Sequence, residues 1–472
     1  MVTALIALLA GQQTLFIERF IGAVNSKDRS VFESHFKEFW DDQQKPAVRA
    51  DRLWPLCENG SPFKIVRQAD SGPGYVRALV EDKEGERWAL MLILTGEPMK
   101  IGGLRLTAPE SLRVPPPKPN REWKDLTDLV DGLMADLKVP AMAIAYQRGG
   151  EPVRQTVRGV RKINSADKAE ASDLWHVGSI GKSLTSTLIA RLIEKGVLKW
   201  NSTLQDCLPG VPMRDEYKAV TLEQVMKHRG GLPKDMGFTL KEVKDICGDE
   251  VDPVKIRTRY SAHILSRAPI GKAGEHFDYS NAGYSLLGHI AEVKLKKPFE
   301  ILVKDHVFIP LGLKNSFAGR PGAPYKMPAG HALDDDGVKP LSLTGQINDL
   351  VRPAGDYWMS IEDLLRFGRE HMLGLKGQSK FLKRETFERL HKGLQEPEND
   401  SLYACGWVID QLPGVEAERH GHNGSNGTFT AELAFFPKLD LVIASAVNRG
   451  GEDMPGPALQ ALTLIAQRHQ RS

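Results

Sequence analysis

The chemistry of this 472-residue chain starts from a serine followed three positions later by a lysine, Ser179-Ile180-Gly181-Lys182. Ser-x-x-Lys occurs four times, beginning at Ser34, Ser61, Ser165 and Ser179, but only the last opens a long helical pattern with one apolar face. Residues three apart share a helix face, so the lysine amine can reach the serine hydroxyl. The free N–H groups at a helix N-terminus favour negative charge on the serine oxygen. The pattern indicates a serine nucleophile, while an ordinary serine N-cap explains the same residues.

A second candidate is Tyr279-Ser280-Asn281, the only place where one of the 9 tyrosines is followed two positions later by Asn. The tripeptide lies where a loop enters a predicted helix. A phenol near an ammonium group loses its proton more readily, so Tyr279 can act as general base and acid. The alternative is a Tyr and an Asn that only make local turn hydrogen bonds.

The third candidate is His422-Asn423-Gly424, just before a predicted strand that begins at Phe429. His-x-Gly or Lys-x-Gly occurs at six further places, so the tripeptide alone also fits a solvated loop histidine. A glycine on an edge strand, however, allows a substrate backbone to lie against it. The order of the three motifs along the chain is more informative than any one of them.

In this order and spacing, the motifs resemble those of the penicillin-recognising serine hydrolases. The most similar group is the class C β-lactamase-related family, which includes D-Ala-D-Ala carboxypeptidases and esterase relatives. The resemblance covers about residues 122–470. Four further segments match turns of that family: His228-Arg229-Gly230-Gly231-Leu232-Pro233, Pro310-Leu311-Gly312-Leu313, Pro353-Ala354-Gly355 and Cys405-Gly406-Trp407.

The resemblance implies a role for each motif residue. Ser179 would be acylated, Lys182 would set its proton affinity, and Tyr279 would shuttle the proton. Substrate binding would fall to Asn281, which would also hold Lys182, to His422 in place of the family's lysine, and to Gly424 and Ser425. The backbone N–H groups of Ser179 and Ser425 would form the oxyanion hole. No cofactor and no metal is implied.

Three positions depart from the family pattern. Asn423 replaces the hydroxyl residue that often binds a substrate carboxylate, which argues against D-Ala-D-Ala and penicillin recognition. Arg229 replaces a small hydroxyl residue, and Asp356 stands where a second glycine is expected. Moreover, no glutamate can be assigned as a dedicated deacylation base, so rapid β-lactam turnover is not expected.

The elements that must position these residues form an α+β fold. Residues 1–110 read as two helices followed by four strands, a small α+β domain that resembles the cone-shaped SnoaL-like fold. A proline-rich linker spans residues 111–121. Residues 122–472 begin with a helix over 126–137 and a strand over 141–146, and they end with strands over 429–436 and 441–447 and a helix over 457–467. This predicts a β-lactamase/transpeptidase-like antiparallel sheet flanked by helices, with an inserted helical lobe and a cleft between them.

Composition narrows the class of protein. Hydrophobic residues make up 41%, charged residues 26%, and the net charge is +3, which provides no electrostatic footprint for nucleic acid. The 4 cysteines contain no Cys-x-x-Cys pair and allow at most one or two disulfides. No apolar run reaches the length of a membrane-spanning helix. Residues 2–11 have the length of a signal-peptide core but lack a preceding Lys or Arg, so they are a first helix or a signal peptide.

These observations predict a serine hydrolase that forms an acyl-enzyme on Ser179 and cleaves an amide or ester, either a D-amino-acid peptide or a small ester. The alternative is a non-catalytic protein that binds a peptide or cell-wall fragment on the same scaffold. The expected partner is a small-molecule or peptide substrate. We expect export to the periplasm or the cell exterior, with a cytoplasmic location as the alternative; the sequence leaves the oligomeric state open.

Overall fold

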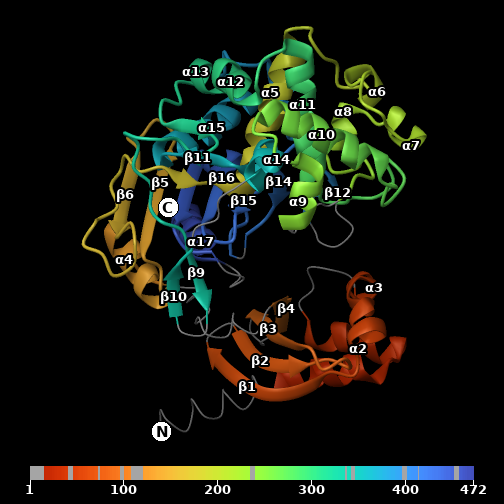
Figure 1. The fold of residues 1–472 in the computed structure, drawn as a ribbon. Coiled ribbons are helices and arrows are strands. Elements are labelled where there is room, and N and C mark those ends of the chain that lie inside the picture. The colour runs from red at the N-terminus through yellow and green to blue at the C-terminus, as the bar shows by residue number, and fades with distance from the viewer. Residues whose placement is uncertain are drawn as a thin grey trace.

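The computed structural model describes residues 15–40, 46–72, 75–95, 100–107, 121–233, 240–334, 337–341, 346–395, 401–412, 414–450 and 456–471. Figure 1 shows the small N-terminal part in red and orange and the large part in yellow to blue. The two parts have separate hydrophobic cores: one is built from residues between Ile17 and Ile101, the others from residues between Leu129 and Ala466.

The small part begins with a helix over residues 15–26, followed by α2 (Arg29–Phe39), α3 (Pro46–Pro55) and a turn of π-helix over Leu56–Gly60. Asp28 caps α2, because its carboxylate accepts the N–H groups of Ser30 and Val31. An antiparallel sheet follows in chain order: β1 (Lys64–Gly72), β2 (Tyr75–Glu81), β3 (Arg87–Thr95) and β4 (Lys100–Thr107). The two helices and four strands expected from the sequence are present, and α3 is an addition.

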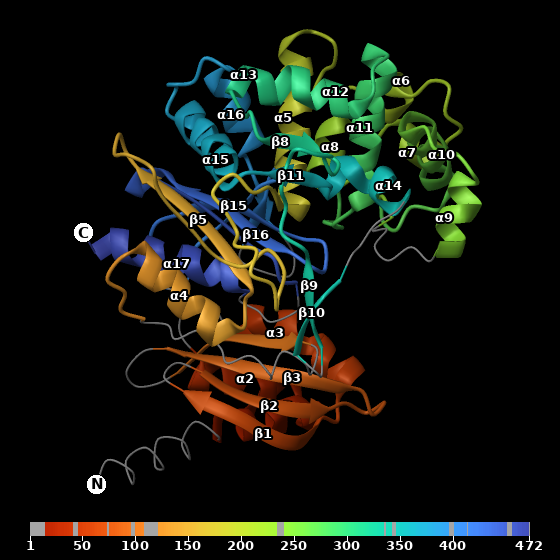
Figure 2. The same ribbon diagram turned by 60° about the vertical axis from the view of Figure 1, so that its left-hand side comes forward.

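An eight-stranded antiparallel sheet forms the centre of the large part (Figure 2). Its order is β12 (Leu394–Gln395), β13 (Leu402–Tyr403), β14 (Val408–Asp410), β15 (Arg419–Ser425), β16 (Thr430–Phe436), β17 (Leu441–Val447), β5 (Ala141–Arg148) and β6 (Arg154–Gly159). Strands β5 and β17, 300 residues apart, pair with Ala145 opposite Ala444. The two ends of the domain therefore meet in one antiparallel sheet, as the sequence predicts.

Helices cover both faces of this sheet (Figure 2). On one face α4 (Leu126–Leu137) and α17 (Pro457–Arg471) pack on Met142 and Ile144 of β5. On the other face α5 (Gly181–Glu194) and α15 (Ile361–Leu375) share a core with Ala143 and Ala145. Successive side chains of a strand point to opposite faces, so both sides of β5 are buried over residues 141–145, where its sequence is continuously apolar.

The helical lobe is inserted between β6 and the C-terminal strands, and α5 leads into it. Its remaining helices are α6 (Leu204–Cys207), α7 (Asp215–Lys218), α8 (Leu222–Met226), α9 (Leu240–Cys247), α10 (Pro253–Ser266), α11 (Asn281–Leu295), α12 (Phe299–Val303), α13 (Ile309–Leu311) and α14 (Gln346–Gly355), with a π-helical segment over Lys304–Phe308. A short sheet, β7 (Trp175–His176), β11 (Tyr357–Met359) and β8 (Ser316–Ala318), joins the lobe to the main sheet. A hairpin, β9 (His331–Asp334) and β10 (Gly337–Pro340), and α16 (Arg384–Leu390) complete the domain.

One element differs from expectation. The nearest strand expected from the sequence begins at Phe429, after His422, whereas His422 itself lies in β15, paired with Leu433 of β16. The strand sequence RHGHNGS has no β-branched or large aliphatic residue, so local propensity gives no strand signal. Pairing with the strongly apolar β16 overrides that propensity.

Candidate active site

Ser179 lies in a single turn of 3₁₀-helix, Gly178–Ile180, that leads directly into α5. Gly178 has φ +52°, and a Cβ atom added there would overlap the backbone nitrogen of Ser425. Only glycine combines this backbone conformation with such a close approach. Ser179 is half-buried, whereas Gly178 and Ile180 are buried, so Ser179 is the most accessible residue of the turn.

Lys182 extends from the first turn of α5 to the serine. Its Nζ lies 3.0 Å from Ser179 Oγ and donates to the carbonyl oxygen of Ala354 at 2.9 Å. The side chain is fully buried, and Nζ lies 4.7 Å from the ring centroid of Tyr279. Burial lowers the pKa of Lys182 well below its usual range. A neutral amine has a lone pair as well as N–H groups, so one face can bind Ala354 while the lone pair faces the serine.

Tyr279 precedes α11, whose N-terminus is capped by the Ser280 hydroxyl through a 3.0 Å bond from the Gly283 N–H. Burial raises the pKa of Tyr279, and a hydrogen bond with Ser179 offsets part of that effect. The phenol therefore stays protonated near neutral pH, beside an amine whose own pKa is lowered. The sequence expectation of a phenol made acidic by an ammonium group does not match this balance, because desolvation disfavours both charged forms.

The backbone of β15 passes unusually close to the serine turn. A Cβ atom added at Gly424 would overlap the carbonyl oxygen of Val177 and lie 2.7 Å from the Ser179 nitrogen. Ser425 follows at the end of the strand, and its hydroxyl donates to the carbonyl of Phe429 at 2.8 Å. On the other side, β14 pairs with β15 only up to Gly421. The outer half of β15 is therefore an edge, as expected for the strand that carries Gly424.

Among the described hydrogen bonds, neither His422 nor Asn281 contacts Ser179 or Lys182. The His422 ring is buried, with Nε2 3.2 Å from the Tyr403 hydroxyl and Nδ1 2.6 Å from the carbonyl oxygen of Asn423. Burial, with a smaller effect of Lys182, lowers the pKa of His422 to about 3. Asn281 is half-buried at the start of α11. Among the described residues, the Lys182 amine bonds Ser179 and Ala354, and the expected bond to Asn281 is not among its contacts.

Two of the additional matching segments hold α5 in place. Gly406, with φ +78°, lies so close to the helix that a Cβ atom would be 2.7 Å from the carbonyl carbon of Lys182. Its carbonyl accepts the Ser183 hydroxyl at 2.5 Å. The carbonyl of Pro353 accepts the Thr185 hydroxyl at 2.6 Å. These contacts fix the helix that carries Lys182 from two sides.

Sequence reasoning missed a buried pair beneath the serine turn. His176 Nδ1 accepts the N–H of Gly178 at 3.2 Å, and its Nε2 lies 3.5 Å from a carboxylate oxygen of Asp356. Asp356 is in turn 3.3 Å from Arg352. In the sequence, only the replacement of an expected glycine by Asp356 pointed to this pair. Its partner His176 is identified by the pairing of β7 with β11.

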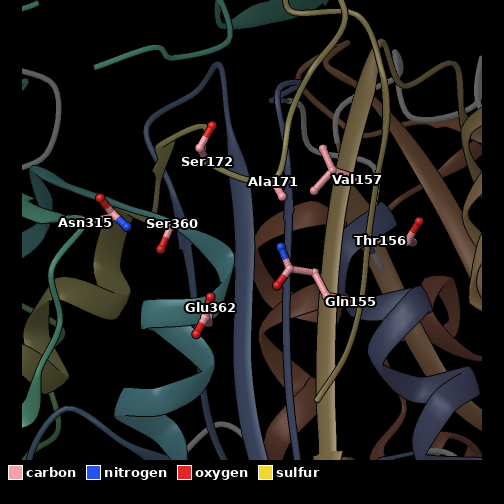
Figure 3. Close-up of a pocket in the computed structure, with 8 residues that line it drawn as sticks. All are labelled: Gln155, Thr156, Val157, Ala171, Ser172, Asn315, Ser360 and Glu362. Atoms are coloured by element: carbon pink, nitrogen blue, oxygen red, sulfur yellow. The ribbon is translucent and has the colours of Figure 1, made fainter. Parts of the chain in front are cut away.

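The structure also has a hollow of about 570 Å³ between β6 and the N-terminus of α15 (Figure 3). Gln155, Thr156, Asn315, Ser360 and Glu362 are among its lining residues, and none of the motif residues contributes to it. Among the residues that the structure describes, no cluster of His, Cys, Asp or Glu is arranged to hold a metal ion.

A family model described as Beta-lactamase matches residues 126–468, about three quarters of the chain. The chain belongs to the Beta-lactamase family. Among its relatives, penicillin-binding protein 4 of Amycolatopsis lactamdurans is 24% identical over 68% of this chain and 84% of its own length. Protein flp of Staphylococcus aureus strain MW2 is 23% identical over 67% of this chain, a match that spans only 61% of the relative.

Solved structures show that this Beta-lactamase family member has the expected fold. The octameric penicillin-binding protein homologue from Pyrococcus abyssi has a TM-score of 0.60 at 23% identity, covering 72% of this chain and 76% of its own. A D-amino acid amidase from Ochrobactrum anthropi gives 0.59 at 19%, covering 74% and 100%. A class C β-lactamase gives 0.58 at 20%, covering 72% and 94%. The family match starts at residue 126, so the SnoaL-like resemblance of the first domain stays a prediction.

None of the described helices is both long and apolar enough to cross a lipid bilayer. The apolar segment 2–11, on which the expectation of export rests, lies outside the described residues. The compartment therefore stays a prediction.

Proposed function

We propose that this protein is a serine hydrolase that forms an acyl-enzyme on Ser179. The observation that carries the proposal is the 3.0 Å separation of Ser179 Oγ from the fully buried amine of Lys182. Serine has too high a pKa to attack unaided and needs an adjacent base. A lysine kept neutral by burial can be that base at neutral pH.

In the acylation step, Lys182 Nζ takes the Ser179 proton as the oxygen attacks the substrate carbonyl. The carbonyl oxygen becomes an oxyanion, which the backbone N–H groups of Ser179 and Ser425 would hold. Removing one such donor typically costs about 10²–10³ in rate. The close approach of Gly424 to Val177 and Ser179 supports this assignment, because it brings the two backbone segments together.

Tyr279 then completes the proton transfer. Its phenol is neutral and hydrogen-bonded to Ser179, so it can donate to the leaving amine or alcohol and recover the proton from Lys182. Water attacks the acyl-enzyme by the reverse route, with the same groups returning the proton to Ser179. Asn281, Gly424 and Ser425 would contact the substrate, and the buried His422 would support them from within β15.

We propose an amide or ester as substrate, with a D-amino-acid peptide or a small ester as the two candidates. The D-amino acid amidase from Ochrobactrum anthropi, which shares the fold, is consistent with amide cleavage. Asn423 in place of a hydroxyl residue is consistent with a substrate other than penicillin. We also propose that the hydrolase domain is residues 122–472, linked by residues 111–121 to a domain over residues 1–110.

Active-site labelling tests the proposal. A fluorophosphonate probe should label the wild-type protein and Ser165→Ala, and it should not label Ser179→Ala. Ser165 is the matched control because it begins another Ser-x-x-Lys, in a loop where its hydroxyl bonds the Lys162 carbonyl. Equal labelling of Ser179→Ala would refute acylation there. Binding without turnover across an ester, D-Ala-D-Ala and nitrocefin panel would instead favour the non-catalytic binder.

A further inference from the structure

Four hydrogen bonds link the loop after Tyr279 to strand β15. The Ser280 N–H donates to His228 Nδ1 at 3.0 Å, and His228 Nε2 lies 3.2 Å from the Tyr403 hydroxyl. The same hydroxyl lies 3.2 Å from His422 Nε2, and His422 Nδ1 lies 2.6 Å from the carbonyl oxygen of Asn423. Three side chains form this hydrogen-bonded chain: His228 from the turn after α8, Tyr403 from β13 and His422 from β15.

The backbone groups at the two ends of this hydrogen-bonded series constrain where its protons lie. A backbone N–H can only donate, so His228 Nδ1 is an acceptor and Nε2 carries the ring proton. A carbonyl oxygen can only accept, so His422 Nδ1 carries a proton; in the neutral ring Nε2 is then an acceptor. Tyr403 therefore accepts from His228 and donates to His422. The acceptor role of Nδ1 makes His228 neutral, and with a neutral His422 all four bonds run in one direction.

The surroundings disfavour an additional proton. Burial is the largest effect and lowers the pKa of both rings; a protonated Lys182 would add to it at both, and Arg419 adds to it at His422. Tyr279, Tyr284 and Tyr403 are the remaining titratable groups against His228. The Tyr284 hydroxyl is hydrogen-bonded to Tyr403, but it donates its own proton to the Met226 carbonyl at 2.7 Å, so toward Tyr403 it can only accept.

Both ends of the chain hold parts of the proposed machinery. The His228 ring lies against the Tyr279 ring with centroids 4.4 Å apart, and the Tyr403 ring meets Tyr279 edge-on at 6.3 Å. At the other end, Asn423 directly precedes Gly424. A shift of either end would move the phenol or the strand edge relative to Ser179.

We propose that His228, Tyr403 and His422 are positioning residues: a one-directional chain of neutral side chains that holds the Tyr279 ring and the outer end of β15 in register with Ser179. The effect on catalysis depends on the proposed function, whereas the hydrogen-bonded chain itself does not. It also gives His422 a different task from that of a family lysine, because a neutral imidazole with both nitrogens engaged provides no positive charge to a substrate carboxylate.

Nitrogen NMR of histidine-labelled protein tests the chain without any need for activity. We expect His228 as the Nε2–H tautomer and His422 as the Nδ1–H tautomer, both neutral from about pH 8 down to about pH 5. His228→Gln and His422→Gln assign the signals. An imidazolium signal at either position within this range, or the opposite tautomer, would overturn the proposal even if the protein proves to be an active hydrolase.

Acylation kinetics test the positioning role. Tyr403→Phe keeps the ring but removes the two central bonds, so it should slow acylation of Ser179 by about 10–100-fold, as expected from a small misplacement of reacting groups, with little change in substrate KM. Tyr217→Phe, at a buried tyrosine on α7, is the matched control and should acylate at the wild-type rate. Melting temperatures check that both variants fold, and an unchanged acylation rate in folded Tyr403→Phe would refute positioning.

The pH profile separates a neutral chain from a titrating histidine. Because neither imidazole gains a proton near neutrality, the pH midpoint of acylation should be the same in the wild type and in His422→Gln. A midpoint near the ordinary histidine value of about 6.5 that disappears in His422→Gln would show that His422 titrates in the working range and would refute the neutral chain.

Discussion

Lys182 is the residue whose chemistry depends most on its surroundings. It is fully buried, its hydrogen-bond contacts are the Ser179 hydroxyl and the Ala354 carbonyl, and burial is the cause of its lowered pKa. Among the described residues no carboxylate pairs with it, and because a buried unpaired charge is costly, burial favours the neutral amine at a cost in stability. The same burial makes the group a base.

Replacing Lys182 by methionine should reveal that cost. The folded pKa is depressed and the unfolded value is about 10.4, so between them the unfolded state binds one more proton and wild-type stability rises with pH. Lys182→Met should therefore be more stable than wild type near pH 7, with an advantage that shrinks as pH rises toward about 10.4. Urea unfolding at several pH values measures this. Lys199→Met, at an exposed lysine, is the control, and a pH-independent difference at Lys182 would contradict a neutral amine.

Tyr279 should matter for rate rather than for stability. Its phenol is the proton donor of the proposed mechanism, and a positioned acid or base typically contributes about 10²–10⁴-fold. Tyr279→Phe should slow acylation by that factor while the melting temperature stays close to wild type. Single-turnover labelling with an activated ester measures the rate, and an unchanged rate would remove Tyr279 from the mechanism.

At the scale of elements, the site depends on two backbone segments in closer contact than side chains allow. The serine turn and β15 meet at Gly178 and Gly424, where an added Cβ atom would overlap the opposite backbone. These atoms belong to backbone segments fixed by α5 and by the central sheet, so moving either segment would cost free energy.

Gly424→Ala should therefore separate the serine turn from the strand edge. We expect a loss of about 1–3 kcal/mol in unfolding free energy, typical of overpacking, and loss of Ser179 labelling. Gly210→Ala is the matched control, because a Cβ atom there meets nothing within 4 Å and the residue does not have a positive φ. Normal labelling of Gly424→Ala would show that the close approach is unnecessary for acylation.

At the scale of the whole molecule, packing holds the fold together without covalent links. All four cysteines are free and buried. Burial raises the pKa of Cys57 and Cys207 to about 11 and that of Cys405 to about 12, so their thiols stay protonated. The one or two disulfides that the sequence allowed are not formed.

A reducing agent should therefore leave the molecule unchanged. The melting temperature should be the same with and without dithiothreitol, and a thiol reagent should react with the four cysteines only after unfolding. Scanning calorimetry and thiol titration in native and denaturing buffer measure the two effects. A lower melting temperature under reducing conditions would reveal a disulfide.

Much of this arrangement follows from local sequence patterns. The helix over 126–137 and the strand over 441–447 have the bounds expected from their apolar periodicity, because buried faces impose a period that the sequence must follow. The Ser-x-x-Lys spacing likewise fixes the 3.0 Å approach of Lys182 to Ser179, since three residues is nearly one helical turn. The family resemblance rested on the same short-range features.

What only the tertiary structure decided concerns groups that are distant in the chain. The neutral state of Lys182 and Tyr279 comes from desolvation by surrounding elements, which no local pattern records. His422 became a buried strand residue because β16 pairs with it, and His228 and Tyr403 gained a role because α8 and β13 bring them together, 175 residues apart. Spacing along a helix is fixed by bonds, whereas burial and charge state are set by everything that folds around a residue.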